Sequence, residues 1–250
     1  MQRYFIDREQ WRDSHITIVG NDVHHITRVM RMGTGDEIIA IHPDKGPALC
    51  KITDISEDTV VCKFGEWRKE DRELPVQVTI VSAIGKGDKL EQVVQKGTEL
   101  GAHAFIPFKA ERCVAKWENK KVDKKINRLE KIAKEAAEQS ERSHVPDIYP
   151  PVSLSDLRTR KKAFDRCFFA YADEARRGSS YALHTRLAEA SPGEKVLVVF
   201  GPEGGFSDQE VQTLDGDGFL SIRLGPRILR METAPLYFLS SISFLFEEQE

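Results

Sequence analysis

Two stretches near the C-terminus decide the fold, Phe200-Gly201-Pro202-Glu203-Gly204-Gly205 and Leu224-Gly225-Pro226-Arg227-Ile228-Leu229-Arg230-Met231-Glu232-Thr233-Ala234. Each contains a Gly/Pro-rich turn after an apolar run, residues 196–200 and 219–224, and each precedes a helical pattern. In α/β proteins, ligands bind where the carboxyl ends of strands give way to loops. The spacing therefore fits two walls of one pocket, and it fits equally well two tight turns with no ligand.

The first loop suits a close approach between a ligand and the backbone. Three glycines among residues 201–205 leave backbone N–H and C=O groups uncovered, and Pro202 limits the freedom of the loop. Ser207 and Glu210 have the spacing of a capping box for the helix that follows.

The second loop favours the pocket. Apolar Ile228 and Leu229 stand between Arg227 and Arg230, as in an apolar wall with cations at its edge. Thr233 is predicted to cap the last helix. Both loops together predict a small-molecule pocket built from backbone and apolar side chains. Its charged border comprises Glu203, Arg227, Arg230 and Glu232.

From residue 76 onward, strand and helix patterns alternate. This alternation predicts an α/β fold with a mostly parallel sheet and helices on both faces. The predicted strands are residues 76–83, 104–108, 167–171, 195–200 and 219–224. The predicted helices are residues 89–100, 123–142, 181–190, 207–214 and 233–248.

Residues 1–70 differ, because short β-branched runs follow one another there. Strands separated by turns at this spacing predict a small β-barrel, with strands at 16–19, 37–41, 50–55 and 59–64. A charged segment ending in proline, residues 65–75, is the predicted linker. The predicted domains are therefore residues 1–70 and 71–250.

One helix, predicted at residues 22–30, interrupts the barrel strands. Its adjacent His24 and His25 point to different faces, which favours capping or packing over a shared metal. Arg28 and Arg31 lie three residues apart on one face. They fit a phosphate contact, and they fit a solvated surface pair at least as well.

Composition narrows the class of protein. The chain has 250 residues and a net charge of −3, so the whole molecule is not a basic nucleic-acid coat. Its four cysteines form no Cys-x-x-Cys pair, which favours reduced, mostly buried thiols. Residues 1–5 lack an apolar signal core and residues 234–246 are too short to span a bilayer, so we expect a cytoplasmic protein without membrane contact.

Several common catalytic motifs are absent. The sequence has no Gly-x-x-x-x-Gly-Lys-[Ser/Thr], no Gly-x-Gly-x-x-Gly, no His-Glu-x-x-His and no Gly-x-Ser-x-Gly. Hydrolase and metalloenzyme functions therefore lack their usual motifs, and we expect no metal site.

A basic stretch lies between residues 109 and 134, which contain ten Lys/Arg against four Asp/Glu. Clustered cations bind phosphates by releasing counterions, so this stretch fits an RNA surface. It also fits a solvated helix face. The residues at its centre are Lys116, Lys120, Lys121, Lys124, Lys125 and Arg128.

The two C-terminal stretches resemble the SPOUT methyltransferases, and within them the enzymes that methylate uridine N3 in 16S ribosomal RNA. The resemblance extends through residues 96–101, 138–142 and 145–146 into residues 24–31 and 35–36, and so covers nearly the whole chain. One departure is Gly97, where the family has alanine. This exchange of one small residue for another puts little in doubt.

The resemblance implies a PUA-like barrel that binds RNA, followed by an α/β domain whose C-terminal part forms a deep trefoil knot. It implies S-adenosylmethionine as cofactor, a homodimer, and the small ribosomal subunit or its 16S ribosomal RNA as partner. Carried onto this sequence, the implied cofactor residues are Phe200, Gly201, Pro202, Glu203, Gly204, Leu224, Gly225, Ile228, Leu229, Thr233 and Ala234.

Methylation at uracil N3 requires loss of the N3 proton from a base that is unpaired or flipped out. A base, or a cation that stabilises the uridine anion, must lie within hydrogen-bond reach. Our candidates are Arg230 as anion stabiliser and Glu232 as base. Glu203 is a third candidate, which alternatively only braces its loop.

Two other functions compete with methyl transfer. The first is an RNA-binding ribosome assembly factor that keeps the fold without catalysis, and the intact cofactor loops argue against it. The second is a dinucleotide-dependent oxidoreductase, which the missing Gly-x-Gly-x-x-Gly disfavours. Titrations with S-adenosylmethionine and with a nicotinamide dinucleotide separate the three.

Overall fold

In the computed structural model, the described residues are 1–70, 72–171 and 183–248, and they divide into two units. The first unit comprises Met1–Arg72 with Ala137–His144. The second comprises Glu73–Ala136 with Val145–Glu250. The later segment of the first unit comes from far along the chain, so the units are not two consecutive pieces of sequence.

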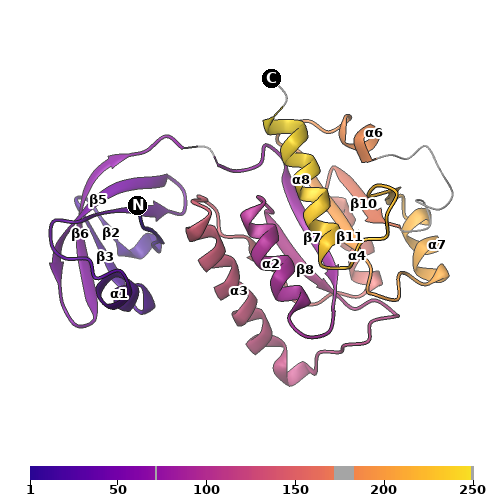
Figure 1. Cartoon of the computed structure of the whole chain (residues 1–250), viewed down its shortest axis with the longest axis horizontal. Helices are drawn as coiled ribbons and strands as arrows, with labels where there is room; N and C mark the ends of the chain where they lie inside the picture. Colours follow the sequence, from indigo (N-terminus) through magenta and orange to yellow (C-terminus); the bar gives the residue numbers. More distant parts are fainter. Residues whose placement is uncertain (71, 172–182, 249–250) are drawn as a thin grey trace. The chain divides into compact units, whose positions relative to one another are not determined.

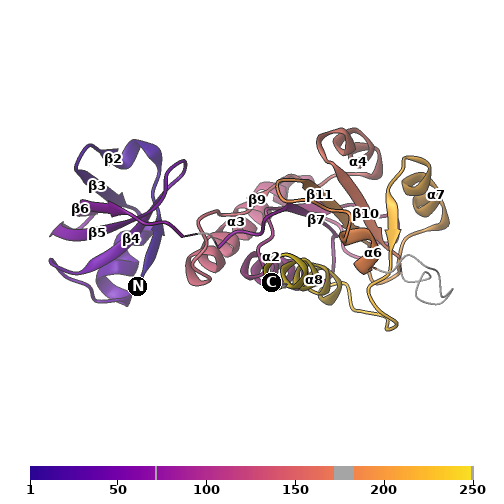
Figure 2. The same cartoon turned by 90° about the horizontal axis from the view of Figure 1, so that it is seen from above.

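The first unit is built on a curled sheet (Figure 2). In its described part this sheet has six strands in the order β1-β4-β5-β6-β3-β2. Among the pairings of these described strands, only β1–β4 is parallel. Alternate side chains, such as Ile16 and Ile18 of β3, point into one apolar core. The strands are β1 Arg3–Phe5, β2 Trp11–Arg12, β3 His15–Val19, β4 Glu37–His42, β5 Gly46–Ile55 and β6 Thr59–Trp67.

The four strands predicted for this unit are present, but the predicted linker begins too early. Residues 65–67 belong to β6 and pair with β5 as far as Trp67 opposite Ala48. Gly65 permits this pairing, because a Cβ there would lie 2.9 Å from the carbonyl oxygen of Leu49. Gly65 therefore allows β5 and β6 to approach closely, and it does not mark the end of β6.

The predicted helix at 22–30 is a short α-helix, α1 Asn21–His24, continued by the π-helical turn η2 His25–Val29. His25 lies beside Tyr4, with 3.0 Å between its Nδ1 and the tyrosine hydroxyl, in agreement with a packing role. Arg31 follows with φ +54°, a left-handed conformation that glycine adopts at lower cost.

The second unit contains a parallel sheet, with order β12-β10-β11-β7-β8-β9 in the described residues. Every recorded pairing in it is parallel, as the alternation of strands and helices predicted. Strand β12 is shorter than the predicted 219–224, and β9 was not predicted because it has only two residues. The strands are β7 Gln77–Ala83, β8 Ala104–Phe108, β9 Asp147–Ile148, β10 Arg166–Ala170, β11 Lys195–Phe200 and β12 Leu220–Ile222.

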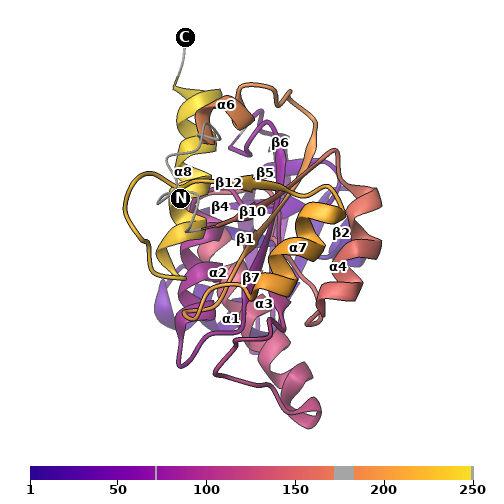
Figure 3. The same cartoon turned by 90° about the vertical axis from the view of Figure 1, so that its right-hand side faces the viewer.

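Helices cover both faces of this sheet, as predicted (Figures 1 and 2). Helices α2, α3, α6 and α8 pack on one face, and α4 and α7 pack on the other, as the end-on view in Figure 3 shows for α8, α4 and α7. Their bounds are α2 Lys89–Glu99, α3 Val122–Gln139, α4 Leu154–Arg160, α6 Leu183–Leu187, α7 Asp208–Gly216 and α8 Thr233–Glu247. Short 3-10 turns are η1 Arg8–Gln10, η3 Asn119–Lys121 and η4 Lys161–Ala163.

Two helices differ from their predicted bounds. Helix α3 ends at Gln139, and Glu141 beyond it has φ +59°, which stops the helix before the predicted residue 142. For the helix predicted at 181–190, residues 181–182 lie outside the described part of the chain, and α6 occupies Leu183–Leu187. In the described ranges no helix has the length and apolar character needed to cross a bilayer.

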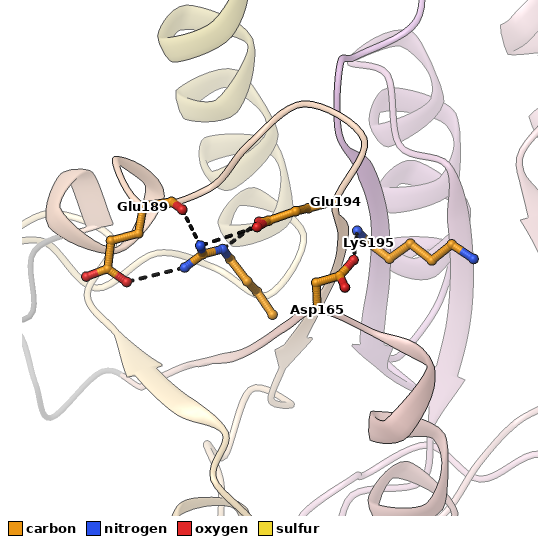
Figure 4. Close-up of polar contacts among 5 residues, drawn as sticks. Asp165, Glu189, Glu194 and Lys195 are labelled. Atoms are coloured by element: carbon orange, nitrogen blue, oxygen red, sulfur yellow. Dashed lines mark hydrogen bonds and ion pairs between the residues drawn. The ribbon is translucent and has the colours of Figure 1, made fainter.

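A charged cluster lies at the amino edge of the sheet, and Figure 4 labels four of its residues, Asp165, Glu189, Glu194 and Lys195. Arg166 donates from Nε to Glu194 at 2.6 Å, from another guanidinium nitrogen to the Glu189 carboxylate at 3.3 Å, and to the Glu189 carbonyl. Beside it, the Lys195 amide donates to the Asp165 carboxylate at 2.7 Å. These bonds fasten the segment before β11 to the start of β10.

Candidate functional site

A cavity of about 640 Å³ opens at the opposite, carboxyl edge of the sheet. Both predicted loops line it, and ten of the predicted cofactor residues are in its wall: Phe200, Gly201, Pro202, Glu203, Gly204, Leu224, Gly225, Ile228, Leu229 and Ala234. Arg227 and Arg230 also line it. Thr233 and Glu232 are not among the lining residues. The loops are thus two walls of one pocket.

The first loop is a tight turn held open by its glycines. The Gly205 amide donates to the Pro202 carbonyl at 2.9 Å, and Gly205 has φ +68°. A Cβ on Gly201 would lie 3.2 Å from the Phe206 ring, so the backbone rests directly on that ring. The predicted capping box of Ser207 and Glu210 is confirmed at the start of α7.

Two residues that follow β8 brace the first loop from outside. Arg112 donates to the carbonyls of Gly204 and Phe206 at 3.2 and 3.0 Å. Buried Glu210 accepts the Glu111 amide at 2.8 Å as well as the Ser207 amide. The loop conformation is therefore fixed by the protein before any ligand binds.

The second loop presents exposed Ile228 and the left-handed Gly225, with φ +74°. Its exit into α8 differs from the sequence prediction, because Thr233 is the first helical residue and not the cap. Glu232 holds the N-cap position, and its side chain makes no capping hydrogen bond. The Arg230 carbonyl instead accepts the amides of Thr233 and Ala234 at 2.9 and 3.0 Å.

The first residue of α2, Lys89, meets both loops. Lys89 donates from Nζ to Glu203 Oε1 at 2.7 Å and lies 3.7 Å from Glu232 Oε2. The hydrogen bond from Lys89 lowers the pKa of the Glu203 carboxyl below its usual range, and the same bond raises the pKa of Lys89. Both groups are therefore charged at neutral pH, so Glu203 is a weak proton acceptor.

Arg230 differs from these residues. It is exposed at the rim of the cavity, and within the described ranges its side chain makes no recorded ion pair. A guanidinium group without a carboxylate partner is available to an incoming anion. The predicted catalytic candidates thus divide into a paired group, Glu203 and Glu232, and an unpaired one, Arg230.

The sequence prediction missed Lys89 and Arg112, which lie more than 90 residues before the loops they contact. A signal was nevertheless present. Both residues follow predicted strands, 76–83 and 104–108, and the carboxyl ends of parallel strands share one edge of a sheet. Other lining residues not predicted are Ala170, Tyr171, Gly205, Phe206, Asp208, Ile222 and Met231.

The predicted RNA-binding cations are exposed on their units. Lys120 and Lys121 lie 3.5 and 3.2 Å from Glu118, and Arg128 lies 2.6 Å from Glu91. Lys125 lies over the Trp117 ring, 4.9 Å from its centroid. In the described part of the chain, Lys116 and Lys124 make no recorded ion pair. Arg28 and Arg31 are exposed on the first unit.

The four cysteines are free thiols, three of them buried, as predicted. Burial raises the pKa of Cys50 to about 11 and that of Cys62 to about 12, so neither is a thiolate at neutral pH. Across residues 1–70, 72–171 and 183–248, no group of three or more His, Cys, Asp or Glu residues is placed to hold a metal ion.

Comparison with known proteins identifies the family. Residues 72–243 match the family model of the RNA methyltransferase domain, and residues 18–65 match that of the RNA methyltransferase PUA domain. The chain is 48% identical over 250 residues to ribosomal RNA small subunit methyltransferase E of Bacillus subtilis, covering 99% of this chain and 98% of that one. The chain belongs to the ribosomal RNA small subunit methyltransferase E family.

Two solved structures of similar proteins contain the predicted cofactor. One is ribosomal RNA small subunit methyltransferase E of Neisseria gonorrhoeae bound to S-adenosylmethionine, with a TM-score of 0.84, 25% identity and 98% coverage of both chains. The other is a putative methyltransferase of Legionella pneumophila with the same cofactor, with a TM-score of 0.85, 28% identity and 97% coverage of both chains. The resemblance noted from sequence is thereby confirmed, and this family member has an RNA methyltransferase domain.

The cavity fits S-adenosylmethionine. Its volume lies in the range of about 300–1,000 Å³ that is usual for small-molecule sites. Apolar side chains such as Ile222, Leu224 and Ala234 suit the adenine ring, and glycine backbone suits its polar edge. The charged rim residues Asp208 and Arg227 suit the amino and carboxylate groups of the methionine part.

Proposed function

We propose that the protein methylates N3 of a specific uridine in 16S ribosomal RNA, with S-adenosylmethionine as methyl donor. The observation that carries this proposal is the cavity at the carboxyl edge, whose two walls are the loops that carry the family resemblance. When bound there, S-adenosylmethionine supplies a methyl group already activated by its sulfonium. The remaining demands fall on the protein, which must orient the base and accept a proton.

The rim of the cavity offers a group for the first task, and Glu232, next to the lining residue Met231, is the candidate for the second. Arg230, exposed and without an ion pair in the described ranges, is our candidate for stabilising the uridine anion. Glu232 is our candidate for the base that accepts the N3 proton. Glu203 is already bonded to Lys89, so its role is to brace the first loop. The target uridine must be unpaired, because N3 is otherwise engaged in a base pair.

The knot and the dimer are part of the same proposal. After β12 at one end of the sheet order, the chain runs through residues 223–232 to α8, which packs against α2 and β7 near the middle. This return path supports a trefoil knot around the cofactor loops. Exposed Tyr237 and Phe244 on α8 support a homodimer, since large exposed apolar residues often mark interfaces. Because ribosomal RNA is the proposed substrate, we assign the protein to the cytoplasm.

The proposal is tested with the full-length protein, S-adenosylmethionine and small-subunit RNA. Calorimetry should detect one cofactor site per chain, and mass spectrometry should map one new methyl group to uracil N3. Cofactor binding without methylation of RNA or subunits would favour the assembly-factor function. A protein that binds neither cofactor nor RNA would contradict both.

The RNA surface has its own test, because the structure separates paired from unpaired lysines. Lys124→Glu with Lys125→Glu should weaken RNA binding more than Lys120→Glu with Lys121→Glu, since the latter pair already faces Glu118. Reversing all four should lower the salt dependence by roughly one unit of slope for each phosphate that the protein no longer neutralises. An unchanged slope in a binding titration would reject this surface.

A further inference from the structure

Lys89 is the first residue of α2 and lines the cavity from outside the two cofactor stretches. Its Nζ lies 2.7 Å from Glu203 Oε1 in the first loop and 3.7 Å from Glu232 Oε2 in the second. One ammonium group therefore faces a carboxylate from each of the two loops. Its side chain is only 27% exposed, so water screens these interactions less than it would on an open surface.

Glu232 depends on this ion pair. Its Oε2 is buried and, within the described ranges, has no hydrogen-bond partner, although the side chain as a whole keeps 18% exposure. A buried carboxylate oxygen without compensation is costly. Lys89 is the cation recorded within ion-pair distance of it. Without that cation, we expect the Glu232 carboxylate to rotate toward solvent.

A second contact fixes the distance between the segments that carry Lys89 and Glu232. Gly85, in the loop before α2, lies directly against Met231, the neighbour of Glu232. A Cβ on Gly85 would lie 2.6 Å from the Met231 sulfur, so the Met231 side chain packs directly on the Gly85 backbone. Met231 is 6% exposed, which makes this contact part of the core. The position of α2 and that of the second loop are thus linked.

We infer that Lys89 is a positioning residue, which joins the two cofactor loops and assigns their carboxylates different tasks. Glu203 takes the hydrogen bond and holds the first loop, while Glu232 is oriented by the longer ion pair and remains free to take a proton. This inference rests on the proposed function. In the proton transfer, the N3–H bond breaks, an O–H bond forms on the Glu232 carboxylate, and the electron pair stays on N3.

Lys89 itself does not donate or accept that proton. Its bond to Glu203 raises its pKa above the ordinary lysine value, so it stays charged through the neutral range. A constant positive charge beside two carboxylates is what an orienting group requires. It also offsets the repulsion that the two carboxylates would otherwise exert on each other.

The test compares Lys89→Met, which removes the charge, with Lys89→Arg, which keeps it. The control is Lys195→Met, an exposed lysine at the amino edge of the same sheet. Calorimetry should show a cofactor Kd about tenfold higher for Lys89→Met, the usual loss for one charge-assisted hydrogen bond. We expect kcat on RNA to fall further than this, with partial rescue by Lys89→Arg and wild-type values for Lys195→Met.

A double-mutant cycle separates positioning from general loosening of the fold. If Lys89 acts through Glu203, the Kd of Lys89→Met with Glu203→Gln should equal that of Lys89→Met alone. Additive losses, or wild-type Kd and kcat in Lys89→Met, would overturn the inference. Thermal melting checks folding, and Lys89→Gln replaces the methionine variant if that one misfolds. A wild-type protein that binds no cofactor would instead overturn the proposed function.

Discussion

Each edge of the parallel sheet holds a cation between two glutamates, and the two clusters behave differently. At the amino edge, Arg166 bonds to Glu194 and Glu189 through four recorded hydrogen bonds. At the carboxyl edge, Lys89 makes one hydrogen bond to Glu203 and a longer ion pair with Glu232. Similar residue types thus form a cluster with several hydrogen bonds at one edge and a cluster with a single hydrogen bond at the other.

Geometry explains the difference. The guanidinium is a planar fork that serves several acceptors at once, whereas the ammonium is a point charge. The backbone also closes the amino edge, since the Gly193 amide donates to Pro75 and the Gln77 amide donates to Glu194. At the carboxyl edge, glycine-rich loops leave a cavity instead. We therefore expect the reaction to take place at the carboxyl edge, where charged groups can still bind a ligand.

The largest effect is expected from Arg230→Ala at the carboxyl edge. Loss of a charged stabiliser of a developing anion typically lowers kcat by about 10²–10³-fold. Because Arg230 lies at the rim, we expect the protein to keep cofactor binding. Single-turnover methylation and calorimetry measure the two quantities. Near-wild-type turnover on small-subunit RNA would remove Arg230 from the mechanism and weaken the contrast between the edges.

At the amino edge, Arg166→Met should have the opposite profile. It leaves two carboxylates facing each other, and we expect the free energy of unfolding to fall by about 1–3 kcal/mol, as for other charged hydrogen bonds. The methylation rate per folded molecule should not change. Denaturant titration and active-site-normalised kinetics check this. A kinetic defect with unchanged stability would show that the amino edge takes part in the reaction.

A smaller effect comes from two left-handed glycines, one at each edge. Gly225 has φ +74° in the wall of the cavity, and Gly193 has φ +88° at the amino edge. Alanine at either site should cost about 1–2 kcal/mol of stability, because its Cβ is strained in this conformation. Only Gly225→Ala should also weaken S-adenosylmethionine binding severalfold, since relief of strain moves the pocket wall. Equal affinities in the two variants would contradict this.

The smallest effect concerns pH. The hydrogen bond from Arg166 lowers the pKa of Glu194 below its ordinary value of 4.5. This pair therefore contributes stability above pH 4.5, which is lost as pH falls through the lower folded pKa. Glu194→Gln should flatten the acid side of the stability curve in that window. Glu203→Gln, the carboxyl-edge counterpart, should also flatten the acid side of the stability curve. If one variant flattened the curve and the other steepened it, one of the two ion pairs would not form in solution.

Local patterns in the sequence predicted much of this molecule. The parallel sheet, its covering helices and the shared pocket follow from alternation and from two glycine-rich loops after apolar strands. The capping box of Ser207 and Glu210 was readable because its partners are three residues apart. The prediction that Thr233 caps α8 is wrong, because the helix begins one residue earlier than the prediction requires. The amides of Thr233 and Ala234 already donate to the Arg230 carbonyl, and Glu232 holds the N-cap position.

What local patterns could not supply is contact between distant segments. Lys89 and Glu203 are 114 residues apart, and only the order of strands in the sheet brings them together. Gly97 shows a second limit, because a Cβ there would lie 2.8 Å from the Phe105 ring. The alanine that the resemblance leads us to expect at this position would therefore require that ring to shift.

One feature of the first unit bears on how such proteins are inherited. Buried Arg3 pairs with Glu70 and lies 3.7 Å from Glu141, which also receives Arg72 at 2.7 Å. The unit therefore needs the segment Ala137–His144, encoded long after its last barrel strand. A single genetic crossover near residue 72 would bring together Arg3 and Glu141 from different parents. Barrels exchanged between relatives are expected to stay stable only when that later segment is exchanged with them.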